Sequence, residues 1–380
     1  MSTVLQIIPS LGAGGAEQAC VDIAAALKQA GHTPVVISSG GVRVDEVIKA
    51  GGRHVLKNVD TKNPAKMIAN AFWLANFIRE NKIDIVHARS RAPAWSSYWA
   101  AGMTKRPFVT TNHAAYKFSN RYKKFYNSVM VKADRIIAIS DFIASHIRNN
   151  YYMEAANIRI IPRGIDFERF NPANVSAERQ DRVRRAFGLQ GHDNRLILLP
   201  SRLSPIKGQN VLIEAMAQLP SQLDDTIAII LGDDQGRLGY RQELEALIDK
   251  HQLRNRVHLV DHCNDMPTAY SLASLVVAPS LVPEGFGRVP VEAMAMGVPV
   301  IATELGGYTE TIMPGVNGWL VTPGDVKQLA DSITKALSQS PEERMASAQV
   351  VLQHARTRYD KQKMVADTLA VYDELAKTHA

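Results

Sequence analysis

The stretch V-P-E-G-F-G-R-V-P-V-E-A-M-A-M-G, residues Val282–Gly297, decides how the second half of this chain folds. It follows L-V-V-A-P-S (Leu275–Ser280), whose apolar, β-branched residues predict a short buried strand. From Pro290 onward the apolar residues recur at helical spacing, and Gly297 marks the end of that helix. A strand, a glycine-containing turn and a helix start together expose backbone N–H groups, which is a geometry suited to an anion.

Two carboxylates belong to this stretch. Glu284 lies in the turn, and Glu292 follows eight residues later, about two turns into the predicted helix. A ligand with hydroxyls at one end and phosphates in the middle can use both side chains. In the alternative interpretation this is an ordinary βα unit, with Glu284 near the helix cap and Glu292 on the surface. The spacing alone leaves both interpretations open.

Length and composition limit the class of protein. The chain has 380 residues, which fits two domains, and its 46% hydrophobic and 21% charged residues are typical of a globular protein. No apolar run reaches the ~18 residues that span a bilayer, and the N-terminus lacks a basic region. Cys20 and Cys263 are too few for a disulfide framework, so we expect a cytoplasmic protein. The net charge of +7 indicates an acidic partner: nucleic acid, an anionic membrane or a phosphorylated ligand.

Apolar runs alternate with helical patterns along the chain, which is typical of a parallel sheet with helices on both faces. The expected strands of the first half are Val4–Pro9, Pro34–Ser38, Ile83–His87, Phe108–Thr111 and Arg135–Ile139. Those of the second half are Leu196–Pro200, Thr226–Leu231, Val257–Val260, Leu275–Pro279 and Pro299–Ala302. We therefore predict an α/β protein with doubly wound domains at residues 1–170 and 195–361, joined by a linker region at 171–194. Ligands are expected beyond the carboxyl ends of the strands.

The first strand is followed by S-L-G-A-G-G-A-E (Ser10–Glu17), in which Gly14 and Gly15 allow a bound group to approach the backbone closely. The spacing differs from G-x-G-x-x-G, and no acidic residue closes the second strand, so nicotinamide binding is disfavoured. A plain tight turn is the alternative. The fourth strand ends at His113, which is either a proton acceptor or hydrogen-bond donor, or an ordinary polar loop residue.

The second domain opens with L-L-P-S-R-L-S-P-I-K-G (Leu198–Gly208). Arg202 and Lys207 lie five residues apart in the loop after a strand, where two cations can converge on a diphosphate. Solvated surface charges are the alternative. The placement at a strand's carboxyl end, in the half that also holds the two glutamates, favours the diphosphate interpretation.

These motifs together resemble the retaining GT-B glycosyltransferases of family 4, and they follow the family's order over nearly the whole chain. The matching segments are G-G-A-E at Gly14–Glu17, the His113 turn, S-R-L-x-x-x-K-G at Ser201–Gly208 and E-G-F-G-R-V-P-V-E-A at Glu284–Ala293. The resemblance implies two Rossmann-like domains facing across a cleft, with a C-terminal helix at about 362–380 that completes the first domain. It also implies metal-independent, cofactor-free transfer of a hexose-type sugar from a nucleoside diphosphate sugar to a glycan or lipid-linked acceptor, such as lipopolysaccharide or another cell-envelope glycan.

The resemblance further implies a role for each matching residue. Arg202 and Lys207 would hold the donor diphosphate, and Glu284 would lie beside the donor sugar. Glu292 would bind the ribose hydroxyls, and His113 would lie near the reacting sugar. The remaining substrate-binding positions are Gly14 and Gly15 at the phosphates, the backbone of Gly285, Phe286 and Gly287 at the sugar and distal phosphate, and the base loop around His262–Met266.

The stretch from His113 to Lys132, where aromatic residues alternate with basic ones, is the candidate for the acceptor-binding side of the protein. One interpretation is a helix that packs Phe118, Tyr122, Phe125 and Val129 inward, with lysines outside. The other is a peripheral contact with an anionic membrane at the inner face. No strand pattern typical of a nucleic-acid-binding domain accompanies these residues, so nucleic acid is not expected as a partner.

Two alternatives to a glycosyltransferase share the architecture. A nucleotide-sugar epimerase is the enzymatic alternative, and the complete S-R-x4-K-G and E-G-F-G-x4-E segments argue against it. A non-catalytic nucleotide-binding protein is the other, and it is disfavoured because the expected phosphate and sugar contacts are intact.

Overall fold

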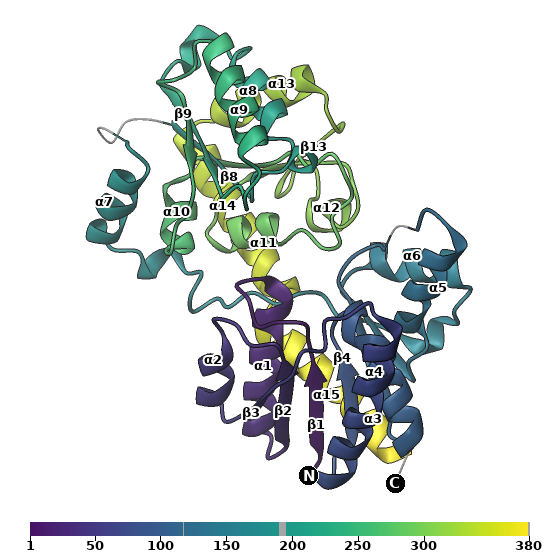
Figure 1. Cartoon of the computed structure of the whole chain (residues 1–380). Coiled ribbons are helices and arrows are strands. Elements are labelled where there is room, and N and C mark those ends of the chain that lie inside the picture. The colour runs from purple at the N-terminus through teal and green to yellow at the C-terminus, as the bar shows by residue number, and fades with distance from the viewer. Residues whose placement is uncertain (117, 190–194, 379–380) are drawn as a thin grey trace. The chain divides into compact units, whose positions relative to one another are not determined.

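The computed structural model describes residues 1–116, 118–189 and 195–378, which divide into two compact units. Unit 1 consists of Met1–Gly164 with Gln362–Ala380, and unit 2 consists of Ile165–Lys361. Each unit is built on a single parallel sheet with helices packed against it (Figure 1). The predicted α/β class with two doubly wound sheets is confirmed.

The sheet of unit 1 has seven strands in the order β3-β2-β1-β4-β5-β6-β7. The strands are β1 (Thr3–Ile7), β2 (Thr33–Ser38), β3 (Arg53–Leu56), β4 (Ile85–Ala88), β5 (Phe108–Asn112), β6 (Arg135–Ala138) and β7 (Ile158–Ile160). The helices are α1 (Gly15–Gln29), α2 (Val44–Lys49), α3 (Pro64–Glu80), α4 (Arg91–Thr104), α5 (Arg121–Ser128), α6 (Asp141–Tyr151) and α15 (Lys361–Thr378). Because the strand order reverses between β1 and β4, a crevice for ligands is expected beyond the carboxyl ends of these two strands.

The sheet of unit 2 has six strands in the order β10-β9-β8-β11-β12-β13. They are β8 (Arg195–Pro200), β9 (Thr226–Leu231), β10 (Val257–Val260), β11 (Leu275–Ala278), β12 (Val300–Thr303) and β13 (Gly318–Val321). The helices are α7 (Ala177–Ala186), α8 (Gln209–Met216), α9 (Leu238–Lys250), α10 (Met266–Leu272), α11 (Arg288–Ala295), α12 (Tyr308–Thr311), α13 (Val326–Leu337) and α14 (Pro341–Arg358). Here the order reverses between β8 and β11, so the loops after these two strands share one edge of the sheet.

The central strands of each sheet are apolar on both faces, because helices cover both faces of a parallel sheet. These strands and the helices packed on them form the hydrophobic core of each unit. In unit 2, Ile197, Leu199 and Ile230 pack with residues of α8 and α13. In unit 1, Val371 and Leu375 of α15 pack with Val4 and Ile23, so the end of the chain contributes to the core formed by its beginning (Figure 1).

The segment expected as a linker, residues 171–194, contains α7. This helix is fixed to the start of α10 by an ion pair of 2.6 Å between Arg179 and Asp265, and Asp265 also caps α10 by accepting from the Thr268 N–H. The guanidinium of Arg179 lowers the pKa of Asp265 to about 2. Residues 190–194 of the expected linker lie outside the described residues.

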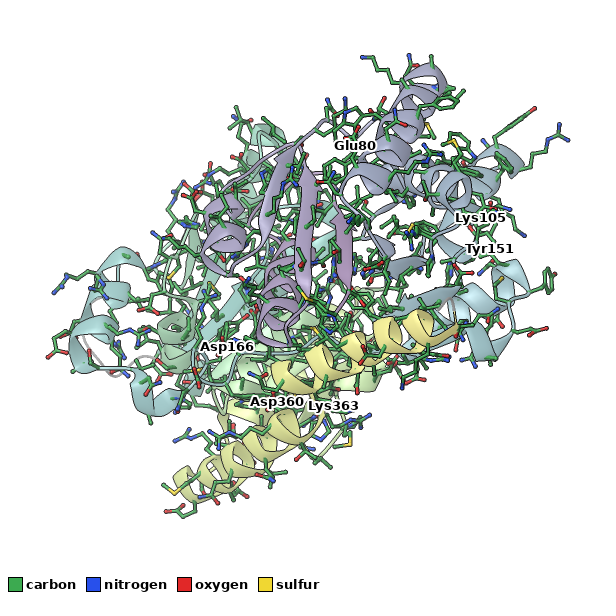
Figure 2. All side chains as sticks on the ribbon, turned by 90° about the horizontal axis from the view of Figure 1, so that it is seen from below. Glu80, Lys105, Tyr151, Asp166, Asp360 and Lys363 are labelled. Carbon is green, nitrogen blue, oxygen red and sulfur yellow. The ribbon has the colours of Figure 1, made fainter. Side chains whose placement is uncertain are left out.

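The chain enters unit 2 at Ile165 and leaves it after Lys361, and these two segments are bonded to each other. Ile165 and Asp360 form an isolated parallel β-bridge, and Ile165 N–H donates to the Tyr359 carbonyl at 2.7 Å. The Lys361 ammonium lies 2.5 Å from the Asp166 carboxylate. Figure 2 labels Asp166 and Asp360 at this place. Both ends of unit 2 are therefore held together at one point.

The inward-packing interpretation of the His113–Lys132 stretch is wrong for two of its four residues. Tyr122 is 72% and Phe125 66% exposed, whereas Val129 is fully buried. The physical reason is the phase of the helix: α5 begins at Arg121, after Phe118, and the chain passes into a 3₁₀ turn at Val129–Val131. The buried polar residue of α5 is Asn127 instead.

Candidate functional site

The loop between β11 and α11 contains the E-G-F-G motif, Glu284–Gly287, and its conformation depends on glycines. Gly287 caps α11 with a φ of +97°, and a Cβ there would lie 2.7 Å from the Tyr308 ring. Gly306 forms a β-bridge with Glu284, and the Gly307 N–H donates to the Glu284 carbonyl at 2.8 Å. A Cβ on either Gly306 or Gly307 would collide with the backbone of this loop. The loop is therefore fixed on both sides by backbone contacts.

The loop after β8 is packed against the end of β11. Lys207 ends a 3₁₀ turn, Pro205–Lys207, and Gly208 follows with a φ of +71°. A Cβ at Gly208 would lie 2.0 Å from the Pro279 carbonyl oxygen, so only glycine permits this close approach. This close contact places Lys207 and Gly208, at the end of the loop after β8, beside Pro279, at the start of the loop after β11.

Lys207 and Glu284, which are 77 residues apart in the sequence, form an ion pair. The Lys207 Nζ lies 2.5 Å from Glu284 Oε1, and both side chains are partly buried, with 20% and 26% exposure. The Ser280 hydroxyl donates to the same carboxylate oxygen at 3.1 Å. An ammonium and a carboxylate thus meet where the strand order reverses, beyond the carboxyl ends of β8 and β11.

Arg202 lies in the same loop as Lys207, directly after the β8 segment. Its backbone carbonyl accepts from Gln209 Nε2 at 2.9 Å, and the N–H of the next residue, Leu203, donates to the Asp233 carbonyl. The Arg202 side chain is exposed and forms no ion pair with any described residue. A guanidinium on a fixed backbone, without a carboxylate partner, is available for an anionic ligand.

Glu292 is not on the surface, so the surface interpretation of this residue is wrong. It is 8% exposed, and its carboxylate accepts from the Tyr270 hydroxyl at 2.9 Å and from Arg288 Nη2 at 2.5 Å. Burial, followed by the neighbouring Glu292 charge, raises the pKa of Tyr270 well above its usual value. Neither partner was predicted from the sequence. The spacing of Arg288 and Glu292, four residues apart on one helix, was the available signal for the first.

The expected base loop follows β10. His262 is exposed, and its Nε2 lies 2.6 Å from Asn264 Oδ1. Met266 is the first residue of α10. Within the described residues, no hydrogen bond or ion pair joins His262 or Met266 to Lys207, Glu284 or Glu292.

In unit 1, two of the expected positions are joined by a residue that the sequence analysis missed. Arg163, which is 8% exposed, donates from Nη1 to the Gly15 carbonyl at 3.0 Å and from Nη2 to His113 Nδ1 at 2.9 Å. Gly14 caps α1 without any side-chain hydrogen bond. Arg163 lies in an irregular segment after β7, where no periodic pattern could reveal its position.

The protonation state of His113 follows from this contact. Because a guanidinium only donates, Nδ1 accepts, and the ring proton is on Nε2. Burial, and then the charges of Arg163, Arg89 and His87, hold the pKa of His113 well below its usual value. The imidazole is therefore neutral at neutral pH, and the Arg89 backbone, which opposes this lowering of the pKa, is its other hydrogen-bonding neighbour.

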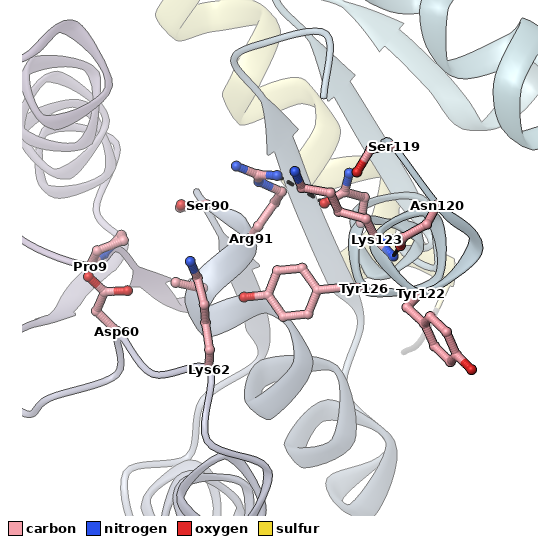
Figure 3. A pocket seen from close by; sticks show the side chains of 12 residues that line it. Pro9, Asp60, Lys62, Ser90, Arg91, Ser119, Asn120, Tyr122, Lys123 and Tyr126 are labelled. Carbon is pink, nitrogen blue, oxygen red and sulfur yellow. Dashed lines mark hydrogen bonds between the residues drawn. The ribbon is translucent and has the colours of Figure 1, made fainter. Parts of the chain in front are cut away.

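A cavity of about 710 Å³ lies wholly within unit 1 (Figure 3). Its walls come from the segments after β1, β3 and β4 and from the start of α5. Among the described residues there is no group of three or more His, Cys, Asp or Glu side chains arranged to hold a metal ion. No helix within the described part of the chain is both long and apolar enough to span a membrane.

Comparisons with known proteins agree with this geometry. Residues 181–350 match the model of "Glycosyl transferases group 1", and residues 13–169 match that of "Glycosyltransferase Family 4". The crystal structure of a glycosyltransferase from Rickettsia africae is 33% identical with a TM-score of 0.91, and the match covers 99% of both chains.

Two further relatives are more distant. The structure of Anabaena Alr3699/HepE in complex with UDP and glucose is 26% identical, with a TM-score of 0.84 over 98% of this chain and 100% of that one. Lipopolysaccharide glucosyltransferase WaaG of Escherichia coli is 27% identical over 78% of this chain and 80% of its own length. The two matching family models, the relative that is 33% identical over 99% of its length and the two parallel-sheet units show that this chain belongs to the group 1 glycosyltransferases with the GT-B fold.

Proposed function

We propose that this glycosyltransferase transfers a hexose-type sugar, with retention of its anomeric configuration, from a nucleoside diphosphate sugar to a glycan or lipid-linked acceptor. The observation that supports this most directly is the Lys207–Glu284 ion pair, which joins the two loops that the family resemblance assigns to the donor. We infer that unit 2 binds the donor and that unit 1 binds the acceptor.

The charges on unit 2 suit the chemistry of a leaving diphosphate. When the bond between sugar and diphosphate breaks, negative charge grows on the phosphate and positive character develops on the sugar. Lys207, Arg202 and the N-terminus of α11 at Gly287 supply fixed positive charge for the phosphate. Glu284 supplies negative charge on the sugar side of the same site. We assign no covalent role to it.

The remaining donor contacts are to the ribose and to the base of the nucleotide, and we assign different residues to each. We assign the ribose hydroxyls to Glu292, because Tyr270 and Arg288 hold its carboxylate in one orientation. We assign the base to the loop from His262 to Met266. HepE is described in complex with UDP and glucose, which supports a uridine diphosphate hexose as the first donor to test.

We propose that the reaction needs no metal ion and no cofactor. The reason is the positive charge that the protein already supplies to the diphosphate through Arg202, Lys207 and the start of α11. The neutral His113 would act by hydrogen bonding from Nε2, not as a charged acid.

For the acceptor, the name of the relative, lipopolysaccharide glucosyltransferase WaaG, supports a lipopolysaccharide or another cell-envelope glycan. The exposed aromatic residues Tyr122 and Phe125, beside the exposed Arg121 and Lys123 on α5, support a peripheral contact with an anionic lipid surface. Sedimentation with vesicles of phosphatidylglycerol tests this contact. Removal of both aromatic rings should release the protein, and unchanged sedimentation would contradict the proposal.

A panel of nucleotide sugars tests the function as a whole. The expected result is acceptor-dependent release of nucleoside diphosphate, with a product whose anomeric configuration, read by NMR, matches that of the donor. Conversion of one nucleotide sugar to another without diphosphate release would identify an epimerase. Binding without either product would identify a non-catalytic protein.

A further inference from the structure

We propose that Arg179 is a positioning residue for the base of the donor nucleotide, because it fixes the loop of His262–Met266. This inference rests on the proposed function, in which that loop binds the base. Arg179 lies on α7, which comes before the sheet of unit 2 in the chain and packs beside α10 (Figure 1). Its carboxylate partner is Asp265, at the end of the loop, so its effect on the nucleotide passes through that residue.

The loop between β10 and α10 has the sequence D-H-C-N-D, residues 261–265, and it is polar and open to solvent. His262 and Asn264 are exposed, and Cys263 is partly buried. Within the described residues, the backbone N–H groups of these three residues donate to no protein acceptor. Such groups bind the edge of a base well only if the loop already has one conformation, because a loop that must first be ordered binds more weakly.

An arginine holds the carboxylate at each end of this loop. At the start, Asp261 is paired with Arg241 of α9, but the Asp261 side chain is 63% exposed. At the end, Asp265 is 20% exposed and accepts from Arg179 through both carboxylate oxygens, from Nε at 2.8 Å and from Nη2 at 2.6 Å. Exposed ion pairs contribute little, whereas a forked contact fixes direction as well as distance. The Arg179–Asp265 pair is therefore the stronger of the two anchors.

The guanidinium of Arg179 is itself held in one orientation. Its Nη1 donates to the carbonyl of Asn174, just before α7, and Ser176 caps α7 by accepting from the Arg179 N–H. Nε, Nη1 and Nη2 are thus all used, which leaves the planar group no freedom to rotate. The hydrogen bond from Arg179 is the main cause that holds the pKa of Asp265 at about 2, so this carboxylate stays charged at neutral pH.

Helix α10 connects this anchor to the residue that we assign to the ribose. Asp265 caps α10 by accepting from the Thr268 N–H at 3.3 Å, and Tyr270, further along the same helix, donates to Glu292 at 2.9 Å. Phe170, which is 4% exposed, packs with its ring centroid 6.2 Å from that of Tyr270. The segment from Phe170 through α7 therefore contacts α10 at both of the points that the proposed function assigns to the nucleoside.

The diphosphate is assigned to a different part of unit 2. Arg202 and Lys207 lie in the loop after β8, and no hydrogen bond or ion pair within the described chain joins either of them to Arg179. A ligand that contains a base should therefore depend on Arg179, and a ligand that consists of the diphosphate alone should not.

Titration calorimetry with nucleoside diphosphates and with inorganic pyrophosphate tests the inference on the full chain. The nucleoside probes are uridine, guanosine and adenosine diphosphate, and pyrophosphate lacks both base and ribose. Arg179→Met should weaken binding of the tightest nucleoside diphosphate about tenfold, because the loop must then be ordered on binding, and should change pyrophosphate affinity less than twofold. With saturating donor, kcat should stay within about twofold of the wild type, since the base is remote from the breaking bond.

Arg182→Met is the matched control. Arg182 lies on the same helix, its side chain is 67% exposed, and it approaches Asp265 no closer than 4.0 Å, so its removal should change neither affinity. Asp265→Asn keeps an acceptor for the cap of α10 but removes the charge, so it should reproduce the loss seen in Arg179→Met. Arg179→Lys keeps the charge without the forked contact and should restore part of the affinity.

Three results would overturn the inference. An equal loss of nucleoside diphosphate and pyrophosphate affinity in Arg179→Met would show a general structural role. Nucleoside diphosphate binding that is unchanged in both Arg179→Met and Asp265→Asn would show no role, and wild-type affinity for nucleoside diphosphates no tighter than that for pyrophosphate would show no base contact to position. Failure of the proposed function looks different: no donor in the nucleotide-sugar panel would release nucleoside diphosphate, whatever the affinities are.

Discussion

The geometry of the Lys207–Glu284 ion pair predicts how much activity and how much stability the protein loses when Lys207 is replaced by alanine. In Lys207→Ala, the diphosphate loses a partly desolvated, charge-assisted contact of about 2–4 kcal/mol. This corresponds to a decrease of roughly 30- to 1,000-fold in kcat/KM. The carboxylate of Glu284 would keep only the Ser280 hydroxyl as a side-chain partner among the described residues, so the free energy of unfolding should fall by about 1 kcal/mol.

Arg202→Ala is the matched comparison, because Arg202 lies in the same loop but is exposed and has no ion-pair partner within the described chain. Its turnover should fall, whereas its free energy of unfolding should stay within about 0.5 kcal/mol of the wild type. Steady-state release of nucleoside diphosphate and urea unfolding measure the two quantities.

Because Lys207 and Glu284 are in contact, their effects on turnover should not add. Glu284→Gln alone should lower turnover while nucleotide affinity is nearly kept. The double variant should lose less than the sum of the two single losses, with a coupling energy of about 1 kcal/mol or more. Strict additivity, or wild-type turnover in Lys207→Ala, would refute the assignment of this pair to one donor site, with Lys207 at the diphosphate and Glu284 at the sugar.

Three further predictions concern other parts of the chain. Glu292→Ala should raise the dissociation constant for nucleoside diphosphate about tenfold with little change in kcat, since the ribose is remote from the breaking bond; calorimetry and kinetics check this. His87 is fully buried between Tyr372 and Thr111, and burial, then Arg89, holds its pKa well below its usual value. Since the unfolded chain binds the proton more readily, stability should fall as the pH drops below about 6.5, and urea unfolding at pH 7 and pH 5 measures the loss. Full activity should persist in EDTA; activity that EDTA removes and magnesium restores would contradict a metal-free reaction.

Much of the fold could be predicted because central parallel strands have an unmistakable composition. Thr226–Leu231 and Val257–Val260 were predicted with the bounds that the structure has. The strands that escaped prediction are β3, β7 and β13, and all three lie at an edge of their sheet. Arg53 and Arg159 interrupt the apolar pattern of β3 and β7, which edge strands tolerate because one side is open to solvent.

Within the candidate site, the sequence revealed residues that stand in motifs and missed those that support them. Lys207 and Glu284 were singled out from strand ends and spacing, and the structure brings them into contact. Tyr270 and Arg163 could not be found in the same way, because each reaches its partner across more than 20 residues of chain. Such contacts depend on tertiary packing, which leaves no periodic trace in the sequence.

The helix α5 was misjudged for a related reason. Aromatic residues at helical spacing predict a buried face only if all of them belong to one helix. Phe118 precedes the start of α5 at Arg121, and within the helix Asn127 is buried, whereas Tyr122 and Phe125 are exposed.

The central claim is that the loops after β8 and β11 bind the diphosphate of a sugar nucleotide and stabilise its departure. The most direct test is the rate of nucleoside diphosphate release by the wild type and by the double variant Arg202→Ala, Lys207→Ala, with each donor of the nucleotide-sugar panel. We predict release by the wild type with at least one donor and a loss of 100-fold or more in the double variant, roughly 2.7 kcal/mol or more of transition-state stabilisation. Wild-type rates in a double variant that is correctly folded would contradict the claim.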